Sequence, residues 1–212
     1  MEGGPWRLNP NANISHDASP IADPATRELA ERVIAYLAQG GAGGRLAEVL
    51  GLDVRGLALV LEPSERELPF EQLRAVLRYW RDLPRSGGIP DVLKVEPDRL
   101  LLALGYIMLI DVGEGEDDFR YALYGSKIAE VAGFDMTGKS IWDIPTTSPI
   151  QVFFAACYMA ARRLKRPIYS VHEAPPAITV SHWHRLILPL GKNGEIRRFL
   201  VCNVPISEGK PR

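Results

Sequence analysis

The feature of the sequence that most constrains the fold is a pair of apolar segments near the carboxyl end. They run from His182 to Leu190 and from Glu195 to Val204, and Gly191-Lys192-Asn193-Gly194 joins them. Two extended segments joined through Asn-Gly are typical of an antiparallel β-hairpin. The first segment is apolar on both faces, with Leu186, Leu188 and Leu190 on one and Trp183, Ile187 and Pro189 on the other.

A sheet that is apolar on both faces needs cover on both sides. An antiparallel sheet normally keeps one wet face, and a large apolar patch is rarely left exposed. We expect the cover to come from N-terminal helices, above all Pro69 to Leu83, or from the same sheet of a second subunit. The sequence therefore predicts a homodimer whose interface is shared by the outer face of the sheet and an N-terminal helix.

The strongest helix signal begins at Ser148-Pro149, where Ser148 suits the N-cap and Pro149 the first helical position. The predicted helix runs to Arg166, and its last turn is basic. Cations are favoured there by the helix dipole, so we interpret the basic run as a solvated helix end and not as a nucleic-acid site. One face of the helix is apolar, formed by Ile150, Phe153, Phe154, Cys157, Ala160, Ala161 and Leu164.

The N-terminal part divides into a tail, residues 1–22, and a helical segment, residues 23–67. A helix starts at Asp23-Pro24, and two short helices are predicted over Arg45 to Leu50 and Val54 to Leu61. Their spacing suits a helix-turn-helix, which would make the protein a transcriptional regulator. The second of them offers Arg55 and little else to base edges, so we do not expect DNA binding.

Strands and helices alternate in a definite order after residue 68. Leu100 to Val112 and Phe119 to Tyr124 form a predicted hairpin, a short helix begins at Ser126, and Ile168 to Glu173 is a strand. The predicted fold class is therefore α+β: a five-stranded antiparallel sheet with helices on one face, preceded by N-terminal helices. Residues 68–206 form this unit, and 207–212 are a C-terminal tail.

Three segments in this order carry a family resemblance. Tyr124 to Ile128, Gly133 to Ser140 and Trp183 to Leu190 together resemble the PAS domain family. The chain is most similar to the variant found in small alpha-proteobacterial proteins in which PAS is the only recognisable domain. The resemblance implies a sensory or protein-interaction module, often with an internal cavity for a small molecule.

The resemblance places a ligand between the sheet and the helix Ser148 to Arg166, but it leaves the cofactor unknown. Flavin photoreceptors of this fold share an Asn-Cys-Arg-Phe-Leu segment; none stands between Gly138 and Ser148, so we do not expect a flavin adduct. A haem sensor needs an axial His, which the helix lacks, so we do not expect haem. The candidate pocket residues are Tyr106, Tyr124, Phe153, Phe154, Cys157, Tyr158 and His184.

Neither metal binding nor catalysis is expected. His182 and His184 would share a strand face, with His172 a conceivable third ligand, but no acid or Cys clearly completes a site. Gly133 to Ser140 matches the phosphate-loop pattern, yet a short helix precedes it and Pro145 follows within two turns. We therefore predict that the protein is not an enzyme.

Net charge and hydropathy bear on location and partners. The formal net charge is −1, so no long-range field steers the chain to nucleic acid or an anionic membrane. The longest apolar run, Leu100 to Val112, is too short to span a bilayer, and no signal peptide is apparent. We expect a cytoplasmic protein that passes its signal to a separate signalling protein, because the sequence contains no output domain that we can identify.

Overall fold

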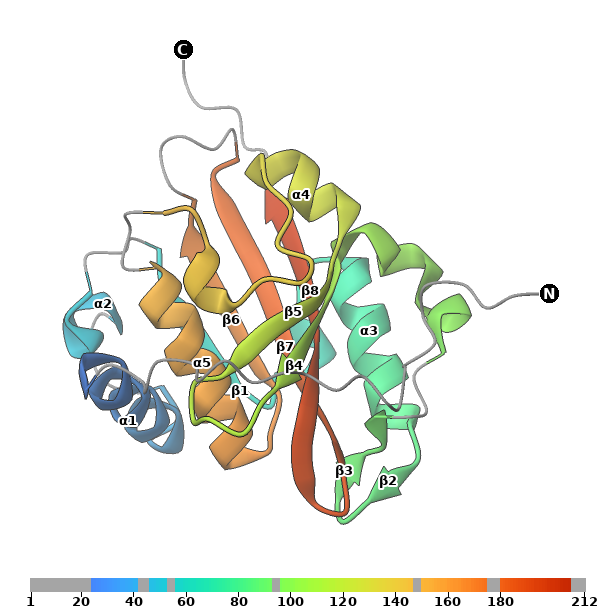
Figure 1. Ribbon diagram of the computed structural model, residues 1–212, viewed down its shortest axis with the longest axis horizontal. Helices are drawn as coiled ribbons and strands as arrows, with labels where there is room; N and C mark the ends of the chain where they lie inside the picture. The colour runs from blue at the N-terminus through green and yellow to red at the C-terminus, as the bar shows by residue number, and fades with distance from the viewer. Residues whose placement is uncertain are drawn as a thin grey trace.

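The computed structural model describes residues 24–41, 46–52, 56–92, 96–146, 150–174 and 180–206. Its centre is an antiparallel six-stranded sheet of order β1-β6-β7-β8-β4-β5 (Figure 1). Two further strands form a separate hairpin, β2 (Arg85–Ser86) with β3 (Ile89–Pro90). The strands of the main sheet are β1 (Ala58–Leu61), β4 (Ile107–Val112), β5 (Phe119–Tyr124), β6 (Ile168–Glu173), β7 (His182–Lys192) and β8 (Glu195–Ile206).

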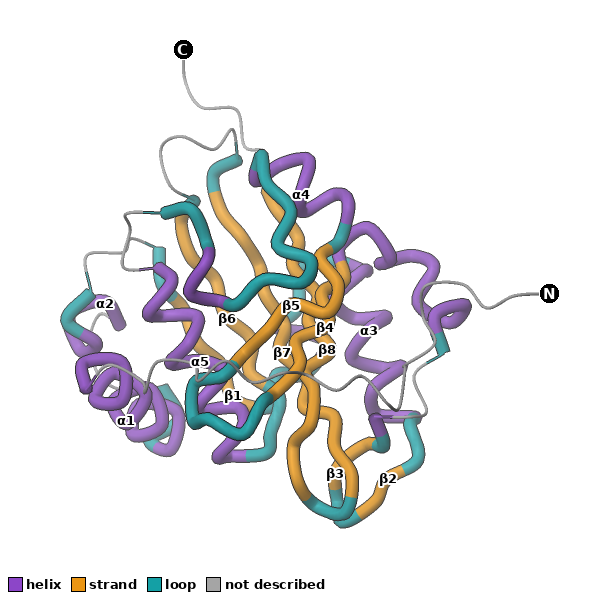
Figure 2. Tube along the Cα trace, viewed as in Figure 1, coloured by secondary structure: helices purple, strands orange, loops and turns teal. Residues whose placement is uncertain are grey.

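Helices cover both faces of the sheet. The longer helices α1 (Pro24–Ala38) and α5 (Ile150–Leu164) lie on one face, called the inner face here, and α3 (Glu71–Asp82) lies on the other, the outer face (Figures 1 and 2). The predicted α+β fold with an antiparallel sheet is confirmed, with six strands in the main sheet where five were expected. The shorter helices are α2 (Leu46–Leu50), η1 (Glu65–Glu67), η3 (Pro97–Tyr106), α4 (Ser126–Ala132) and η4 (Ile141–Asp143).

The inner core forms where α5 packs between the sheet and α1. Small side chains such as Ala156 and Ala160 are fully buried on α5, and they let α1 approach closely. From α1, Leu29, Val33 and Leu37 enter the same core, so this helix, like the edge strand β1, is part of one folded unit with the sheet. Within the described ranges no helix is long and apolar enough to cross a membrane.

The outer core is built by α3 against the last strands of the sheet. Leu73 and Leu77 are buried with Leu188 and Leu200, and the indole Nε1 of Trp80 donates a hydrogen bond to the Pro189 carbonyl at 2.8 Å. The expectation that the Pro69 to Leu83 segment covers the second apolar face is confirmed. Because the cover comes from the same chain, a dimer is not needed to provide it, and the homodimer stays a prediction.

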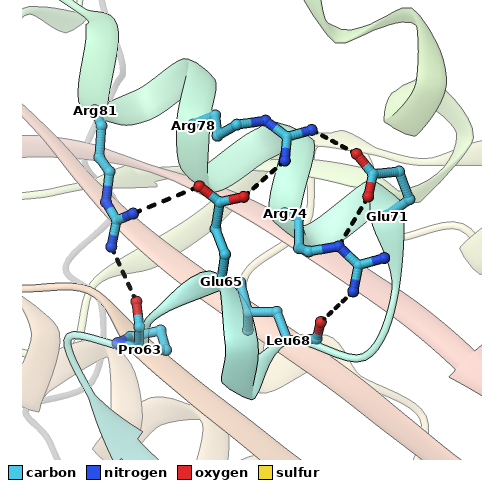
Figure 3. Close-up of polar contacts among 7 residues, drawn as sticks. All are labelled: Pro63, Glu65, Leu68, Glu71, Arg74, Arg78 and Arg81. Carbon is cyan, nitrogen blue, oxygen red and sulfur yellow. Dashed lines mark hydrogen bonds and ion pairs between the residues drawn. The ribbon is translucent and has the colours of Figure 1, made fainter.

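An ion-pair network holds the exposed side of α3 to η1 (Figure 3). Arg78 lies between Glu65 and Glu71, at 2.7 and 2.5 Å, and Arg74 pairs with Glu71 at 2.8 Å. Arg81 donates to the carbonyl of Pro63 at 3.2 Å. Exposed ion pairs of this kind contribute little to stability singly, so we assign the network to orienting α3 as the chain enters it.

The sixth strand corrects a sequence prediction. Residues 58–61 lie within the predicted helix Val54 to Leu61, yet they form β1, in which Leu59 pairs with Ser170 and Leu61 with Ile168 of β6. Pairing with an open sheet edge satisfies backbone groups that a short isolated helix would leave exposed. Residues 53–55 lie outside the described residues. The second helix of the helix-turn-helix alternative is therefore replaced by a strand, and that alternative falls.

The apolar run from Leu100 to Val112 is only half strand. Residues 97–106 form the 3₁₀ helix η3, with Pro97 in its first turn, and β4 starts at Ile107. Leu100 and Ala103 are buried, whereas Leu101 and Leu102 are exposed, which is a three-residue period. The predicted hairpin therefore begins seven residues later than expected, because a short apolar run does not distinguish strand from helix.

The turn predicted at Asn193-Gly194 is confirmed, whereas Ser126, expected to cap the short helix, is its first residue, and Gly125 stands at the N-cap. The helix α4 ends at Gly133, whose φ is 81°, and the β7–β8 turn places Asn193 and Gly194 at φ 53° and 83°. These positive φ values are the left-handed conformations that the helix end and the hairpin turn need. The caps predicted at Asp23 and at Ser148-Pro149, and the tails 1–22 and 207–212, lie outside the described residues.

Candidate functional site

A row of polar side chains crosses the inner face of the sheet. Ser170 on β6 pairs in register with Arg185 on β7, and Arg185 pairs with Asn203 on β8. Residues opposite each other on adjacent strands share a face. Their exposed fractions are 1%, 4% and 3%, so the row, called the polar row here, is enclosed in the inner core.

Arg185 places a positive charge in that interior without a carboxylate. Its Cζ lies 3.6 Å from the ring centroid of Phe154, and Nε and Nη1 have no hydrogen-bond partner among the described residues. No described carboxylate forms an ion pair with it. A cation–π contact is worth about 0.5 to 2 kcal/mol, whereas burying a charge costs several kcal/mol. The stacking on Phe154 therefore compensates only part of the cost.

Other polar atoms around Arg185 are also unpaired. Ser170 Oγ, Asn203 Oδ1 and His172 Nδ1 lack hydrogen-bond partners in the part of the chain that the structure describes. His172 lies two residues from Ser170 on the same strand face, and its ring centroid is 5.0 Å from that of Phe154. Burial, together with the nearby Arg185, holds the pKa of His172 well below its usual value. The ring is neutral at pH 7, so Arg185 is the one charge in this group.

Aromatic side chains surround the polar row. Tyr158 of α5 stacks on Phe199 of β8 with centroids 5.5 Å apart, and Tyr124 lies edge-on to Tyr121. Burial raises the pKa of Tyr124 to about 12 and that of the Cys157 thiol to about 12. All of these groups are neutral at physiological pH, and Cys157 has the character of a packed thiol and not of a nucleophile.

The structure separates the predicted pocket residues into two sets. Phe153, Phe154, Cys157 and Tyr158 are in the inner core, and Tyr124 packs against it. Tyr106 packs against the outer core, at the end of η3. His184 also faces outward. The alternation along β7 explains this, because His184 neighbours Arg185 and so points to the opposite face.

His184 belongs to a small outer-face cluster with Tyr169 and Phe70. Its Nδ1 shares a hydrogen bond with the Tyr169 hydroxyl at 2.5 Å, and the Phe70 ring lies edge-on at 5.1 Å between centroids. Burial lowers the pKa of His184 to about 4. His172 lies on the inner face and cannot join His184 around one ion, and the described residues contain no group of three potential metal ligands.

The segment that matches the phosphate-loop pattern is built differently. The helix α4 precedes it, and Gly133 ends that helix in the left-handed region. At its end, Ser140 caps η4: its hydroxyl accepts from the Trp142 amide at 3.4 Å, and its own amide donates to Asp143 at 2.8 Å. The strand–loop–helix arrangement that cradles phosphate is not formed here.

The basic end of α5 is used within the chain. Arg162 donates to the carbonyl of Gly115 at 2.5 Å, and Arg163 pairs with Glu116 at 2.9 Å and also with Glu31 of α1. Lys165 and Arg166 have partners too, the Gly194 carbonyl at 2.8 Å and Glu62 at 3.3 Å. These cations join α5 to α1, to the β4–β5 loop and to the β7–β8 turn, as a structural role requires.

The antiparallel sheet and the long helix across its inner face define a class of small α+β domains. The sequence model of the PAS domain family matches residues 69–201. The chain therefore belongs to the PAS domain family, and the predicted resemblance is confirmed.

Other comparisons add little beyond the family. A solved structure titled "Structure of an RNA-binding Light-Oxygen-Voltage Receptor" matches with 9% identity and a TM-score of 0.39. The match covers 86% of this chain and 53% of that one, so this chain spans about half the length of that protein. No curated protein matches the chain.

The polar row is the part of the site that the sequence prediction missed. Arg185 stands between Trp183 and Ile187 on the face of β7 that was otherwise expected to be apolar. Asn203 stands in the same way after Val201 on β8. A charged or amide side chain at an inward position of an apolar strand is a signal that period-two alternation could have revealed.

Proposed function

We propose that the chain is a sensory PAS module that binds a small ligand between α5 and the inner face of the sheet. The observation that carries this proposal is the polar row, which is buried beneath α5. Its members Ser170, Arg185 and Asn203 have polar atoms without a partner among the described residues. Buried polar groups are normally hydrogen-bonded, and exceptions call for a partner such as water or a ligand. PAS domains are generally sensory and not catalytic, which agrees with this proposal.

The proposed signal passes from the ligand through α5 to α1. Phe154 and Tyr158 of α5 lie over Arg185, while the helix packs on its other side against α1. If α5 has two positions and a ligand binds one of them more tightly, the ligand increases the population of that position. A separate signalling protein would then recognise the altered α1–α5 surface, and a homodimer remains part of the proposal.

We propose that the ligand is held without a covalent bond. The two cysteines are both buried; burial raises the pKa of Cys157, and Cys202 lies in the outer core, away from the polar row. A thiolate is the reactive form of cysteine, and neither position favours it. The proposal therefore does not include a flavin adduct.

Native mass spectrometry of gently purified protein, combined with an absorption spectrum, tests the ligand proposal. We expect one small molecule per chain that is lost on denaturation, and a spectrum without a haem or flavin band. A protein that carries nothing, and whose mass and melting temperature do not change after incubation with a metabolite extract, would contradict the proposal.

A further inference from the structure

The charge of Arg185 narrows the chemistry of the ligand, an inference that rests on the proposed function. An arginine guanidinium keeps its proton in proteins, so this buried group cannot escape its desolvation by becoming neutral. Its Cζ lies over the Phe154 ring, while Nε and Nη1 have no acceptor among the described residues. A planar anion has the acceptors that these two donors lack.

We propose that the polar row is the recognition site for the carboxylate of a small, singly charged organic acid. The guanidinium of Arg185 pairs with the carboxylate, and the flanking side chains of Ser170 and Asn203 supply further hydrogen bonds from the strands on either side. Arginine matches carboxylate with paired, charge-assisted hydrogen bonds.

The side chains around the polar row determine the charge of the ligand and the chemistry of its remaining part. His172 is neutral at pH 7, so the row offers one positive charge, which suits a carboxylate better than a doubly charged phosphate. The neighbouring side chains are apolar or aromatic: Phe153, Phe154, Tyr158, Ile187 and Val201. The remainder of the acid is therefore an aliphatic or aromatic group without further charge.

Isothermal titration and thermal melting with matched pairs of compounds test this inference. Sodium hexanoate and sodium benzoate are compared with hexanamide and benzamide, which keep the shape and lose the charge, at constant ionic strength in sodium chloride. We expect at least one acid to bind and to raise the melting temperature of the full chain by several degrees, because a ligand stabilises the folded state it binds. The matching amide has little effect.

The Arg185→Met variant isolates the guanidinium. We expect it to weaken acid binding about 30-fold or more, as loss of a buried charge partner does. Without ligand it melts at the same temperature as the unaltered protein or higher, because an unpaired charge has been removed. Arg197→Met is the matched control: that arginine is exposed on β8 and pairs with Glu195, so acid binding stays unchanged.

Each contrary result has its own meaning. Equal binding of acids and amides, or acid binding that survives in Arg185→Met, overturns the carboxylate site and leaves the internal ligand of the proposed function standing. A large fall in the melting temperature of ligand-free Arg185→Met shows a structural partner for Arg185 and also overturns it. If neither acids nor amides bind and the purified protein carries no small molecule, both proposals fail.

Discussion

Buried titratable side chains on both faces of the sheet govern how single residues respond to their surroundings. His172 on the inner face and His184 on the outer face both have a lowered pKa, because burial penalises the charged ring. Arg185 is the opposite case, a buried group that stays charged. These three side chains interrupt strands that are otherwise apolar, and they were harder to predict than the apolar residues around them.

The lowered pKa of His184 makes stability depend on pH. The unfolded ring titrates near 6.5 and the folded ring at about 4, so between these values the unfolded chain binds more protons. The contribution of the neutral His184 ring to the free energy of unfolding is therefore fully present above pH 6.5 and is lost as the pH falls towards 4. At pH 5 the loss of unfolding free energy that His184 causes is about 1 kcal/mol, after allowance for solvent screening at a ring that is not fully buried.

Urea unfolding of the unaltered protein and of His184→Gln, each at pH 7 and pH 5, measures the contribution of His184 to this loss. The glutamine amide can still bond to the Tyr169 hydroxyl but does not titrate. We expect the loss of unfolding free energy between the two pH values to be about 1 kcal/mol smaller in the variant. His172 and Asp117, whose pKa values are also shifted, are present in both proteins, and burial, the largest cause of both shifts, is the same in each. An identical loss in the two proteins would contradict the assignment.

Among the elements, α3 has the clearest energetic role. It seals the outer face with Leu73, Leu77 and Trp80, and Leu77 is 1% exposed. Truncating a buried leucine removes apolar contacts and leaves a cavity. We expect Leu77→Ala to lower the free energy of unfolding by about 2 to 4 kcal/mol in urea melts.

Glu71→Ala is the control on the same helix. Glu71 is exposed and pairs with Arg74 and Arg78 (Figure 3). Removing it breaks the ion pairs and leaves the apolar contact intact, so we expect the free energy of unfolding to change little. Similar values for the two variants would mean that the network, and not the buried face, holds α3 to the sheet.

Element prediction succeeded where a local signal was strong. The strand β6 begins and ends where it was predicted, and β7 and β8 each extend only two residues beyond their predicted ends, because alternation and the Asn193-Gly194 turn specify them. It failed for β1 and η3. Their short apolar runs have no such turn, and contacts with β6 and α3 decide their conformation.

At the scale of the whole molecule, the helix predicted to start at Asp23-Pro24 packs as part of the same fold as the sheet over residues 24–38. The helix α1 shares the inner core with α5, and Arg27 and Glu31 both form ion pairs that reach beyond their own helix. The pocket candidates Phe153, Phe154 and Tyr158 of α5 lie in the inner core, and their contact with a ligand stays a prediction. The site prediction lacked the polar row, because the positions of Ser170, Arg185 and Asn203 on one face become visible only when strand register is known.

Hydrogen exchange measured by mass spectrometry, with and without the ligand recovered from the purified protein, tests the central claim most directly. A ligand on the inner face should slow exchange in α5 and in the neighbouring stretches of β6, β7 and β8, while α3 keeps its rate. Slowed exchange confined to α3 and η3 would place the ligand on the outer face and contradict the account.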